Sequence, residues 1–419
     1  MTDTDQRAQR SGDELRRYVG SMRRQRRWYF AAIAVVAAVA LAVVLVVWFT
    51  GEITHVHLRT AKSAPPNVPA GTPPPAPTRH WQSSDTTAIG TPFVGGTVVT
   101  YSKHAVTGRR ALTGVADWTY TRTDRSVCQV LQLQGKTIAV YENGGNCDEV
   151  STFETDTGQR AWTRTLDENG LAVDGHPAMI ATADTFYVWS AQFVYAIDPV
   201  SGYDRWTYPA AQGCTLTSVV PGSSGVLMSS RCANGNQLFL RDRTAGIDDK
   251  QQTDDKKNQV LWRLPNTNTV PVAADAIVAA LDPTTHQLVT YHPAKGKVQQ
   301  HITLTPAPTA TSPVLHAAAT EQELLWIAGT SYALDGSGTQ LWSAPTSTLP
   351  TLNTPDGGAP SSLTGAVILV PTSSGVAVVD GATGKITAQY SMPPPAPESR
   401  VYSVGDGLLV AGSSTAYYA

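Results

Sequence analysis

The sequence predicts an all-β fold, an eight-bladed β-propeller of four-stranded antiparallel blades, preceded by one transmembrane helix. Two observations lead to this prediction. Residues 28–49 carry no charged side chain, and beyond them tryptophan recurs at a fixed spacing, with 44 residues between Trp118 and Trp162 and again between Trp162 and Trp206. A period of 40 to 50 residues is typical of propeller blades.

The N-terminal residues predict a membrane anchor. Residues 1–27 contain eight Arg and four acidic residues, and the 22 residues of 28–49 would span about 33 Å as a helix, enough for a hydrocarbon core of about 30 Å. Arginines before the apolar run place the N-terminus in the cytoplasm. A cleaved signal peptide is the alternative, but its apolar region is shorter and ends at small residues, whereas this one ends in WFTGEI. We therefore expect a retained, single-pass anchor with a cytoplasmic Arg-rich tail.

A proline-rich segment follows the apolar run. Seven of the sixteen residues in 63–78 are proline, which disfavours helix and sheet and favours an extended spacer. We expect residues 50–79 to be an extracytoplasmic stalk and residues 80–419 to be the propeller.

The repeats continue beyond Trp206. Trp262 follows after 56 residues because a polar insertion, IDDKQQTDDKKNQ at 247–259, lengthens one copy. A degenerate copy containing His292 ends near His301, and further copies end at Trp342 and Tyr390. Each copy reads as an apolar strand, a turn and a second strand that carries an aromatic residue. We interpret the periodic Trp as an apolar plug between neighbouring blades.

Aspartates and glycines recur at the turn within the copies. The acidic residues are Asp156, Asp198, Asp242, Asp335 and Asp380, and the glycines are Gly158, Gly202, Gly338 and Gly384. Aspartate can accept hydrogen bonds from turn N–H groups, and glycine adopts backbone conformations that other residues avoid. One carboxylate per turn does not supply the several oxygens of a calcium site, so we expect these aspartates to be structural.

The blade count rests on the two ends of the repeat region. Seven copies end between Trp118 and Tyr390, and the C-terminal segments RVYSV, GLLVAG and TAYYA supply three more strands. The strand around Trp81 could supply the fourth and close the ring. Seven blades remain the alternative.

The four cysteines predict two disulfides. Cys128 and Cys147 lie 19 residues apart in one copy, and Cys214 and Cys232 lie 18 apart in another. If the first two strands of a blade are antiparallel neighbours, these spacings bring each pair within bonding distance, and an even count suits an oxidising compartment. Zinc is the competing interpretation, but the sequence has no CxxC motif or Cys–His cluster.

No catalytic or nucleic-acid-binding signature is present. The formal charge is −2, and the sequence lacks GxSxG, HExxH and Walker motifs. We therefore expect no catalytic residues, no bound metal, no cofactor and no nucleic-acid partner.

The repeats in DTGQRAW and YALDGSGTQLW resemble the pyrroloquinoline-quinone-type propeller repeat over about residues 80–419. That family includes quinoprotein dehydrogenases, but those enzymes are longer, typically have a vicinal Cys pair, and use an Asp–Glu–Asn set that this sequence does not match. The chain is more similar to the non-catalytic branch with the periplasmic propeller lipoproteins of the outer-membrane assembly machine. Its composition resembles that of actinobacterial envelope proteins.

The resemblance implies a protein-binding scaffold in the cell envelope, here attached to the cell membrane and not an enzyme. The alternatives are a ligand-sensing module for an envelope glycan or peptide and, less favoured, a quinoprotein dehydrogenase. The insertion is the candidate partner-binding loop because it lengthens one hairpin beyond what the fold needs. Its charged residues are Asp248, Asp249, Asp254, Asp255, Lys256 and Lys257.

Overall fold

The computed structural model divides the chain into two compact units, Met1–His57 and Leu58–Ala419. The residues that it describes are 33–41, 54–90, 93–166, 175–182, 184–244, 260–308, 314–318, 321–346, 348, 350–353, 363, 366–396 and 399–419.

In the first unit, residues 33–41 form an α-helix. They lie inside the expected membrane segment 28–49, and the other residues of that segment fall outside the described ones. Within the described residues, no helix has the length and apolar character needed to cross a bilayer.

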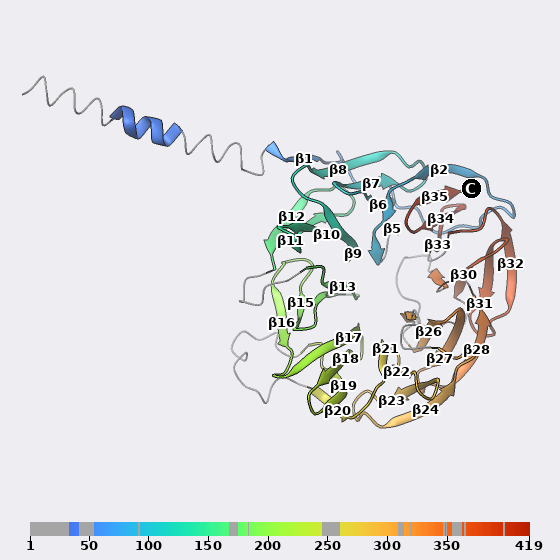
Figure 1. Ribbon diagram of the computed structural model, residues 1–419. Coiled ribbons are helices and arrows are strands. Elements are labelled where there is room, and N and C mark those ends of the chain that lie inside the picture. The colour runs from blue at the N-terminus through green and yellow to red at the C-terminus, as the bar shows by residue number, and fades with distance from the viewer. Residues whose placement is uncertain are drawn as a thin grey trace, which may run out of the picture. The chain divides into compact units, whose positions relative to one another are not determined.

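The described part of the second unit forms eight sheets arranged in a ring (Figure 1), as predicted. Blade 1 contains β6 (Thr97–Tyr101), β7 (Ala105–Arg110) and β8 (Ala116–Arg122), with β3 (Thr86–Thr87) and β5 (Phe93–Val94) on β6 and β1 (Val56–Arg59) on β8. Blade 2 contains β9 (Val127–Leu133), β10 (Lys136–Asn143), β11 (Asn146–Glu154) and β12 (Arg160–Thr165), with β4 (Ile89–Gly90) parallel to β9.

Blades 3 to 7 each use four consecutive antiparallel strands. Blade 3 contains β13 (Ala178–Ala181), β14 (Phe186–Trp189), β15 (Phe193–Ile197) and β16 (Asp204–Pro209), and blade 4 contains β17 (Cys214–Gly222), β18 (Gly225–Cys232), β19 (Gly235–Arg241) and β20 (Val260–Pro265). Blade 5 contains β21 (Val270–Ala274), β22 (Val278–Asp282), β23 (Gln287–Tyr291) and β24 (Val298–Thr303), and blade 6 contains β25 (Val314–Ala318), β26 (Gln322–Ile327), β27 (Thr330–Asp335) and β28 (Gln340–Pro345). Blade 7 contains β29 (Thr351–Asn353), β30 (Val367–Thr372), β31 (Gly375–Asp380) and β32 (Ile386–Ser391).

Blade 8 closes the ring with strands from both ends of the second unit. β33 (Arg400–Val404), β34 (Gly407–Ala411) and β35 (Thr415–Tyr418) pair in order, and β2 (Arg79–Ser83) pairs with β35. Trp81 lies in β2 as expected, and its indole N–H donates to the carbonyl of Ala111 in blade 1, 2.8 Å away. The eight-bladed prediction is confirmed.

The hydrophobic core lies between adjacent blades. One buried cluster joins blades 2 and 3 through residues such as Ile138 and Phe186, and similar clusters follow at each later junction. Each blade is therefore stabilised mainly by its neighbours, because a single sheet cannot bury both of its faces.

The periodic tryptophans lock neighbouring blades together. The indole N–H of Trp118 donates to the Thr155 carbonyl in the next blade, 2.7 Å away, and the ring lies against Gly158. Equivalent pairs, each an indole hydrogen bond to the next blade's turn and a glycine under the ring, are Trp81 with Gly114, Trp162 with Gly202, Trp262 with Gly296 and Trp342 with Gly384. The tryptophans are inter-blade plugs, as the sequence indicated.

Four of the five turn aspartates cap backbone N–H groups. Asp198 Oδ1 accepts from the N–H groups of Val200 and Ser201, and the same role is taken by Asp242, Asp335 and Asp380. Asp156 differs from them: it accepts a hydrogen bond from Thr97, and partial burial raises its pKa above the usual value. The degenerate copy uses His292, whose Nδ1 accepts from the Ala294 N–H.

The proline-rich segment lies against the propeller where we expected a free spacer. The N–H of Val68 donates to the Gly95 carbonyl, Gly71 and Gly405 are hydrogen-bonded, and the Pro75 carbonyl accepts from Ser391. Val68 also packs on the core cluster between blades 8 and 1. Residues 58–79 therefore belong to the same compact unit as the blades.

Both expected disulfides are present. Cys214 and Cys232 face each other on β17 and β18, the first two strands of blade 4. Cys128 is bonded to Cys147, but Cys147 lies on β11, the third strand of blade 2. The expectation that both pairs join the first two strands of a blade is therefore wrong for this pair. The reason is strand length, because β9 is seven residues long and β17 is nine. The 19 residues after Cys128 therefore reach past β10 into β11, whereas the 18 residues after Cys214 reach only the end of β18.

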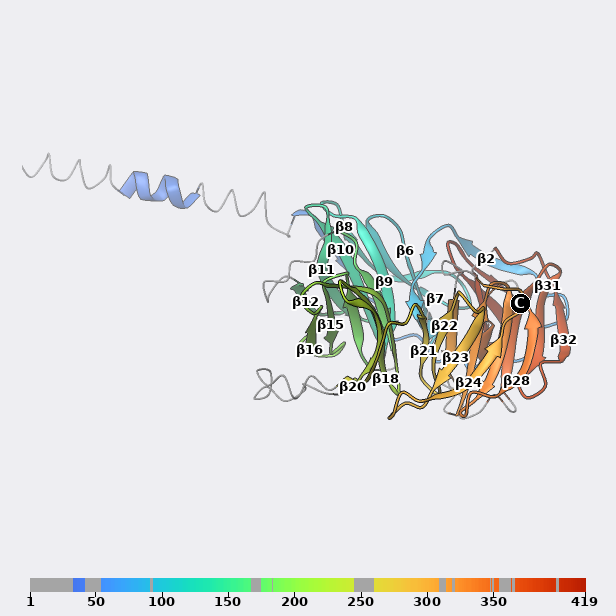
Figure 2. The same ribbon diagram turned by 60° about the horizontal axis from the view of Figure 1, so that its bottom comes forward.

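Antiparallel order places the connections on two faces, between which the strands run (Figure 2). We call the face with the turns between the third and fourth strands, such as 198–203, the motif face. The opposite face, with the blade-to-blade connections such as 123–126, is the crossover face.

Candidate functional site

The candidate site is a surface on the motif face of blades 3 and 4. The predicted partner-binding loop, with Asp248, Asp249, Asp254, Asp255, Lys256 and Lys257, lies outside the described residues, which end at Thr244 before it and resume at Val260 after it. We call the surface around its base, formed by Asp184, Asp198, Val200, Tyr203, Arg205 and Arg243, the blade 3–4 surface.

Exposed apolar side chains mark this surface. The relative exposure of Tyr203 is 77% and that of Val200 is 53%. In the equivalent turns, the residue that follows the turn glycine is Val115, Gln159, Thr339, Lys297 or Lys385. The aromatic residue of blade 3 is thus unlike its counterparts, and the fold does not need an exposed ring at this position.

Two residues of blade 2 and one residue of the turn itself hold the turn that presents Tyr203 in place. The Trp162 indole donates to the Pro199 carbonyl at 3.1 Å, and the guanidinium of Arg164 donates to the Gly202 carbonyl at 2.6 Å. Asp198 caps the turn from within. A side chain on a fixed turn loses less conformational entropy when a partner binds, which favours affinity.

An ion-pair network connects this turn to the base of the insertion. Arg205 donates to Asp198 at 2.9 Å and to Asp184 at 3.2 Å. Arg243, which precedes the insertion, donates to both carboxylate oxygens of Asp184 at 3.0 and 3.1 Å. The Arg243 carbonyl also accepts the indole N–H of Trp206 at 2.8 Å, so the chain is anchored four positions before the insertion starts at residue 247.

These contacts fix the charge of the acidic residues. Partial burial disfavours the carboxylate of Asp184, but the guanidinium groups of Arg243 and Arg205 outweigh it and hold its pKa below the usual value. Burial likewise opposes ionisation of Asp198, and hydrogen bonds from Ser201 and Arg205 lower its pKa overall. Carboxylates with lowered pKa values are poor proton donors or acceptors near neutral pH.

A second charged cluster joins blades 1 and 2 at the crossover face. The side chain of Arg122 is 1% exposed and pairs with Asp124 at 2.8 Å and with Glu149 at 2.5 Å. The hydrogen bond from Arg122 outweighs partial burial and lowers the pKa of Asp124 to about 2. Because its charges are paired with one another and Arg122 is buried between two blades, we assign this cluster a structural role.

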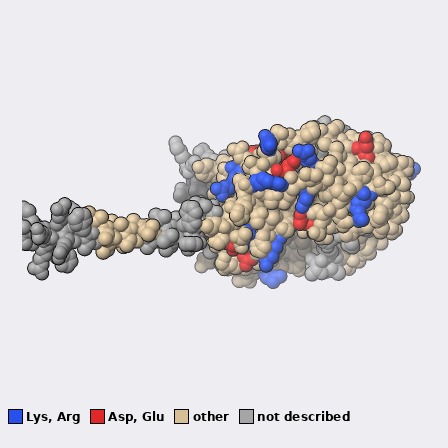
Figure 3. All heavy atoms as spheres, turned by 90° about the horizontal axis from the view of Figure 1, so that it is seen from above, with Lys and Arg blue, Asp and Glu red and all other residues tan. Residues whose placement is uncertain are grey.

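Charged side chains on the view in Figure 3 are sparse, and basic and acidic groups are interspersed. No large field of one sign is visible on that side. This distribution agrees with the formal charge of −2 and suits contact with proteins better than contact with a polyanion.

The described residues contain one group with metal-ligating geometry. The ligand atoms of Cys128, Cys147 and His176 all lie within 4.8 Å of one another. The sequence did not reveal this group, because His176 lies 29 residues beyond Cys147 and joins it only through the fold. The blade 3–4 surface was also missed, although Tyr203 in the turn PVSGYD was a signal that could have been noticed.

The described part of the second unit is an eight-bladed propeller that presents a fixed turn with exposed apolar side chains. The family model described as outer membrane protein assembly factor BamB matches residues 74–241 and 250–413. The chain therefore belongs to this family, and the resemblance seen in the sequence repeats is confirmed.

Solved structures of similar fold include BamB from Moraxella catarrhalis, which is 14% identical, with 82% of this chain and 97% of that chain covered and a TM-score of 0.46. The Pan2 WD40 domain of Neurospora crassa is 12% identical, with 70% and 88% covered and a TM-score of 0.43. BBS1N in complex with ARL6DN is 12% identical, with 68% and 86% covered and a TM-score of 0.39. No curated protein matches the chain.

Proposed function

We propose that this chain is a non-catalytic, protein-binding scaffold of the bacterial cell envelope, held at the membrane by residues 28–49 with its propeller on the extracytoplasmic side. Membership of the BamB family supports a scaffold, since that family is named for assembly of outer membrane proteins. The two disulfides support an oxidising compartment. The uncharged run 28–49 and the arginines before it support the anchor and its orientation, with residues 1–27 in the cytoplasm.

The observation that carries the binding function is the exposed Tyr203 on its anchored turn. Tyrosine and arginine are enriched in the residues that contribute most to protein–protein affinity, and they act best on preorganised surfaces. The turn that carries Tyr203 and Val200 is connected by salt bridges to Arg243, which precedes the insertion at 247–259 in the sequence. Exposed apolar side chains next to paired charged residues match the usual anatomy of a protein interface.

The ionisation of this surface supports a binding role over a catalytic one. Asp184 lies between two guanidinium groups, and its pKa is lowered, so it stays charged and paired at neutral pH. A general acid or base needs a pKa near the working pH. The paired carboxylates of the blade 3–4 surface are instead suited to hold Arg205 and Arg243 in fixed positions.

The experiment is quantitative co-purification from membranes. The full-length chain, extracted in detergent after mild crosslinking, is compared with Tyr203→Ser and with a deletion of residues 248–258. The scaffold predicts one or more envelope proteins that co-purify with the unchanged chain and that fall at least tenfold with either variant. Ile386→Ser is the matched control, since Ile386 is 64% exposed on the outer strand of blade 7, away from the surface.

Equal recovery of the same partners with Tyr203→Ser, the deletion and the control would refute partner binding through the blade 3–4 surface. A stoichiometric quinone absorbance in the purified propeller would instead favour a dehydrogenase. A rise in melting temperature on addition of an envelope glycan or peptide, without protein partners, would favour a ligand sensor.

A further inference from the structure

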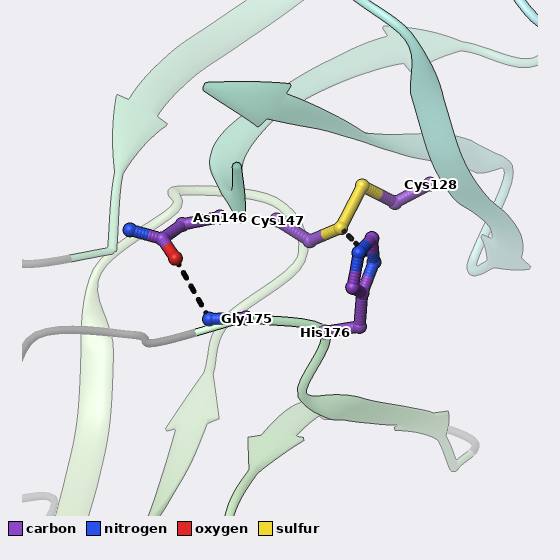
Figure 4. The surroundings of a disulfide bond; sticks show 5 residues. All are labelled: Cys128, Asn146, Cys147, Gly175 and His176. Atoms are coloured by element: carbon purple, nitrogen blue, oxygen red, sulfur yellow. Dashed lines mark hydrogen bonds between the residues drawn. A yellow bond between two sulfur atoms is a disulfide. The ribbon is translucent and has the colours of Figure 1, made fainter. Parts of the chain in front are cut away.

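We propose that reduction of the Cys128–Cys147 disulfide creates a binding site for a thiophilic divalent cation such as Zn²⁺, with the two cysteine sulfurs and the imidazole of His176 as its protein ligands. Figure 4 shows the three side chains together. Cys128 lies on β9 and Cys147 on β11 of blade 2, and His176 lies in the segment before β13 of blade 3. The observation that carries this proposal is the contact of 2.8 Å between Cys147 Sγ and His176 Nδ1.

The distances fit such an ion after a small rearrangement. The Cα atoms of the two cysteines are 6.1 Å apart, and all three ligand atoms lie within 4.8 Å of one another. Two thiolates bound to a tetrahedral Zn²⁺ at about 2.3 Å are about 3.8 Å apart. Opening the S–S bond to that separation requires rotation of the cysteine side chains, and the backbone can stay in place.

The histidine is positioned independently of the disulfide. The Cys147 N–H donates to the Gly175 carbonyl at 2.8 Å, and the Gly175 N–H donates to Asn146 Oδ1 at 2.7 Å. Figure 4 shows the second of these bonds beside the sulfur contact. Because both bonds join residues 146–147 to residue 175, His176 stays beside Cys147 Sγ when the disulfide opens.

Reduction requires a dithiol, and the exposure of the two cysteines decides which sulfur its thiolate attacks. Cys147 is 1% exposed, whereas Cys128 is partly exposed, so a reductant thiolate attacks Cys128 Sγ. The Cys128–Cys147 bond breaks, and its electron pair goes to Cys147 Sγ. The second thiolate of the dithiol then displaces Cys128 Sγ. The reductant ends as a disulfide, and the protein holds two thiolates for the cation.

The second disulfide is a control within the same chain. Cys214 and Cys232 lie at the crossover face, but in the part of the chain that the structure describes they join no group with a third ligand. Two thiolates without a nitrogen ligand hold Zn²⁺ less firmly, since structural and catalytic zinc sites use three or four protein ligands. The proposal therefore assigns the site to one pair only.

The test uses Co²⁺ as a spectroscopic probe on the full-length chain, reduced with dithiothreitol and freed of it under anaerobic conditions. The Cys214→Ser, Cys232→Ser double variant is expected to bind one Co²⁺ per chain with thiolate-to-metal charge-transfer absorption. The Cys128→Ser, Cys147→Ser double variant is expected to bind none. Adding His176→Ala to the first variant is expected to lower the affinity more than tenfold, and Zn²⁺ should displace the Co²⁺.

Absence of Co²⁺ uptake by the reduced first variant would overturn the proposal, and so would unchanged affinity after His176→Ala. If reduction unfolds the first variant, the proposal requires Zn²⁺ to restore the native circular dichroism. Failure of Zn²⁺ to do so would also overturn it. Partner capture is a separate measurement, so this result and that of the proposed scaffold function can be judged apart.

Discussion

At the scale of single residues, the Trp–Gly pairs between blades carry much of the specificity of the fold. Gly158 has a φ of 69°, and a Cβ at this position would lie 2.5 Å from the ring of Trp118. Glycine is required there for two separate reasons, the backbone conformation and the close approach of the indole.

These two reasons can be separated by a matched pair of substitutions. Gly144→Ala places alanine at a φ of 63° with no atom near its Cβ, whereas Gly158→Ala also collides with Trp118. Both should destabilise the propeller, and overpacking should make Gly158→Ala worse by about 1–3 kcal/mol. Urea denaturation followed by tryptophan fluorescence measures the difference. Equal midpoints would mean that the indole is not closely packed on this glycine.

The ion pair of Arg122 and Asp124 predicts an acid-dependent loss of stability. The pKa of Asp124 is lowered from 3.8 to about 2 in the folded chain, so its carboxylate stabilises the fold above about pH 4, and this contribution is lost as the pH falls towards 2. Asp124→Asn should cost on the order of 1 kcal/mol at pH 7, because solvent partly screens the pair, and the deficit should shrink below pH 4.

Melting temperatures between pH 2 and pH 7 measure this deficit. Asp117→Asn is the control. Its partner Arg110 has a side chain that is 58% exposed, so this ion pair should contribute little to the stability of the fold. A deficit for Asp124→Asn that stays constant down to pH 2 would show that the carboxylate does not keep this lowered pKa.

The sequence predicted the structural residues better than the surface residues, for a physical reason. Turn aspartates such as Asp198 and plugs such as Trp118 recur in several copies, so their period reveals them. Tyr203 and His176 each occur once, and their meaning depends on exposure or on a contact between blades. A pattern that repeats along the chain cannot report what is special to one blade.

At the scale of elements, the cysteine spacing predicted the bonded pairs but not all of their strands. The separations of 19 and 18 residues are nearly equal, yet the first disulfide skips β10 and the second joins neighbouring strands. Strand length decides the outcome, and the sequence did not define where β9 and β17 end. The proline content likewise predicted an extended segment but not its contacts. The N–H groups of Val68 and Gly71 donate to carbonyls of the propeller, which the composition could not reveal.

Removal of the second disulfide should destabilise blade 4. Closing a loop of this length lowers the entropy of the unfolded chain by an amount worth about 3 kcal/mol. The Cys214→Ser, Cys232→Ser variant should therefore melt several degrees lower under oxidising conditions. Differential scanning calorimetry with and without reductant tests this, and a variant that melts with the unchanged chain would show that the bond contributes nothing to stability.

At the scale of the whole propeller, closure depends on one short strand from the N-terminal side. β2 pairs with β35, so blade 8 is completed by residues more than 330 positions away in sequence, as shown by the hydrogen bond between Thr78 and Ala419. An open ring would expose the edge of β35 and invite association with other chains.

Replacing residues 79–83 with a Gly-Ser sequence of equal length should lower the melting temperature and produce dimers or aggregates. The matched control replaces β1, residues 56–59, in the same way. β1 lies on the outer edge of blade 1 and closes nothing, so the control should stay monomeric. Size-exclusion chromatography with light scattering distinguishes them. Equal behaviour of the two variants would contradict closure by β2.

The central claim is that the propeller binds a protein through the blade 3–4 surface, and site-specific photocrosslinking tests it most directly. A photoreactive amino acid replaces Tyr203 in one full-length chain and Ile386 in another, and adducts formed in intact cells are identified by mass spectrometry. The account predicts a defined protein adduct at position 203 that is absent at position 386. No adduct at 203, or the same adducts at both positions, would contradict it.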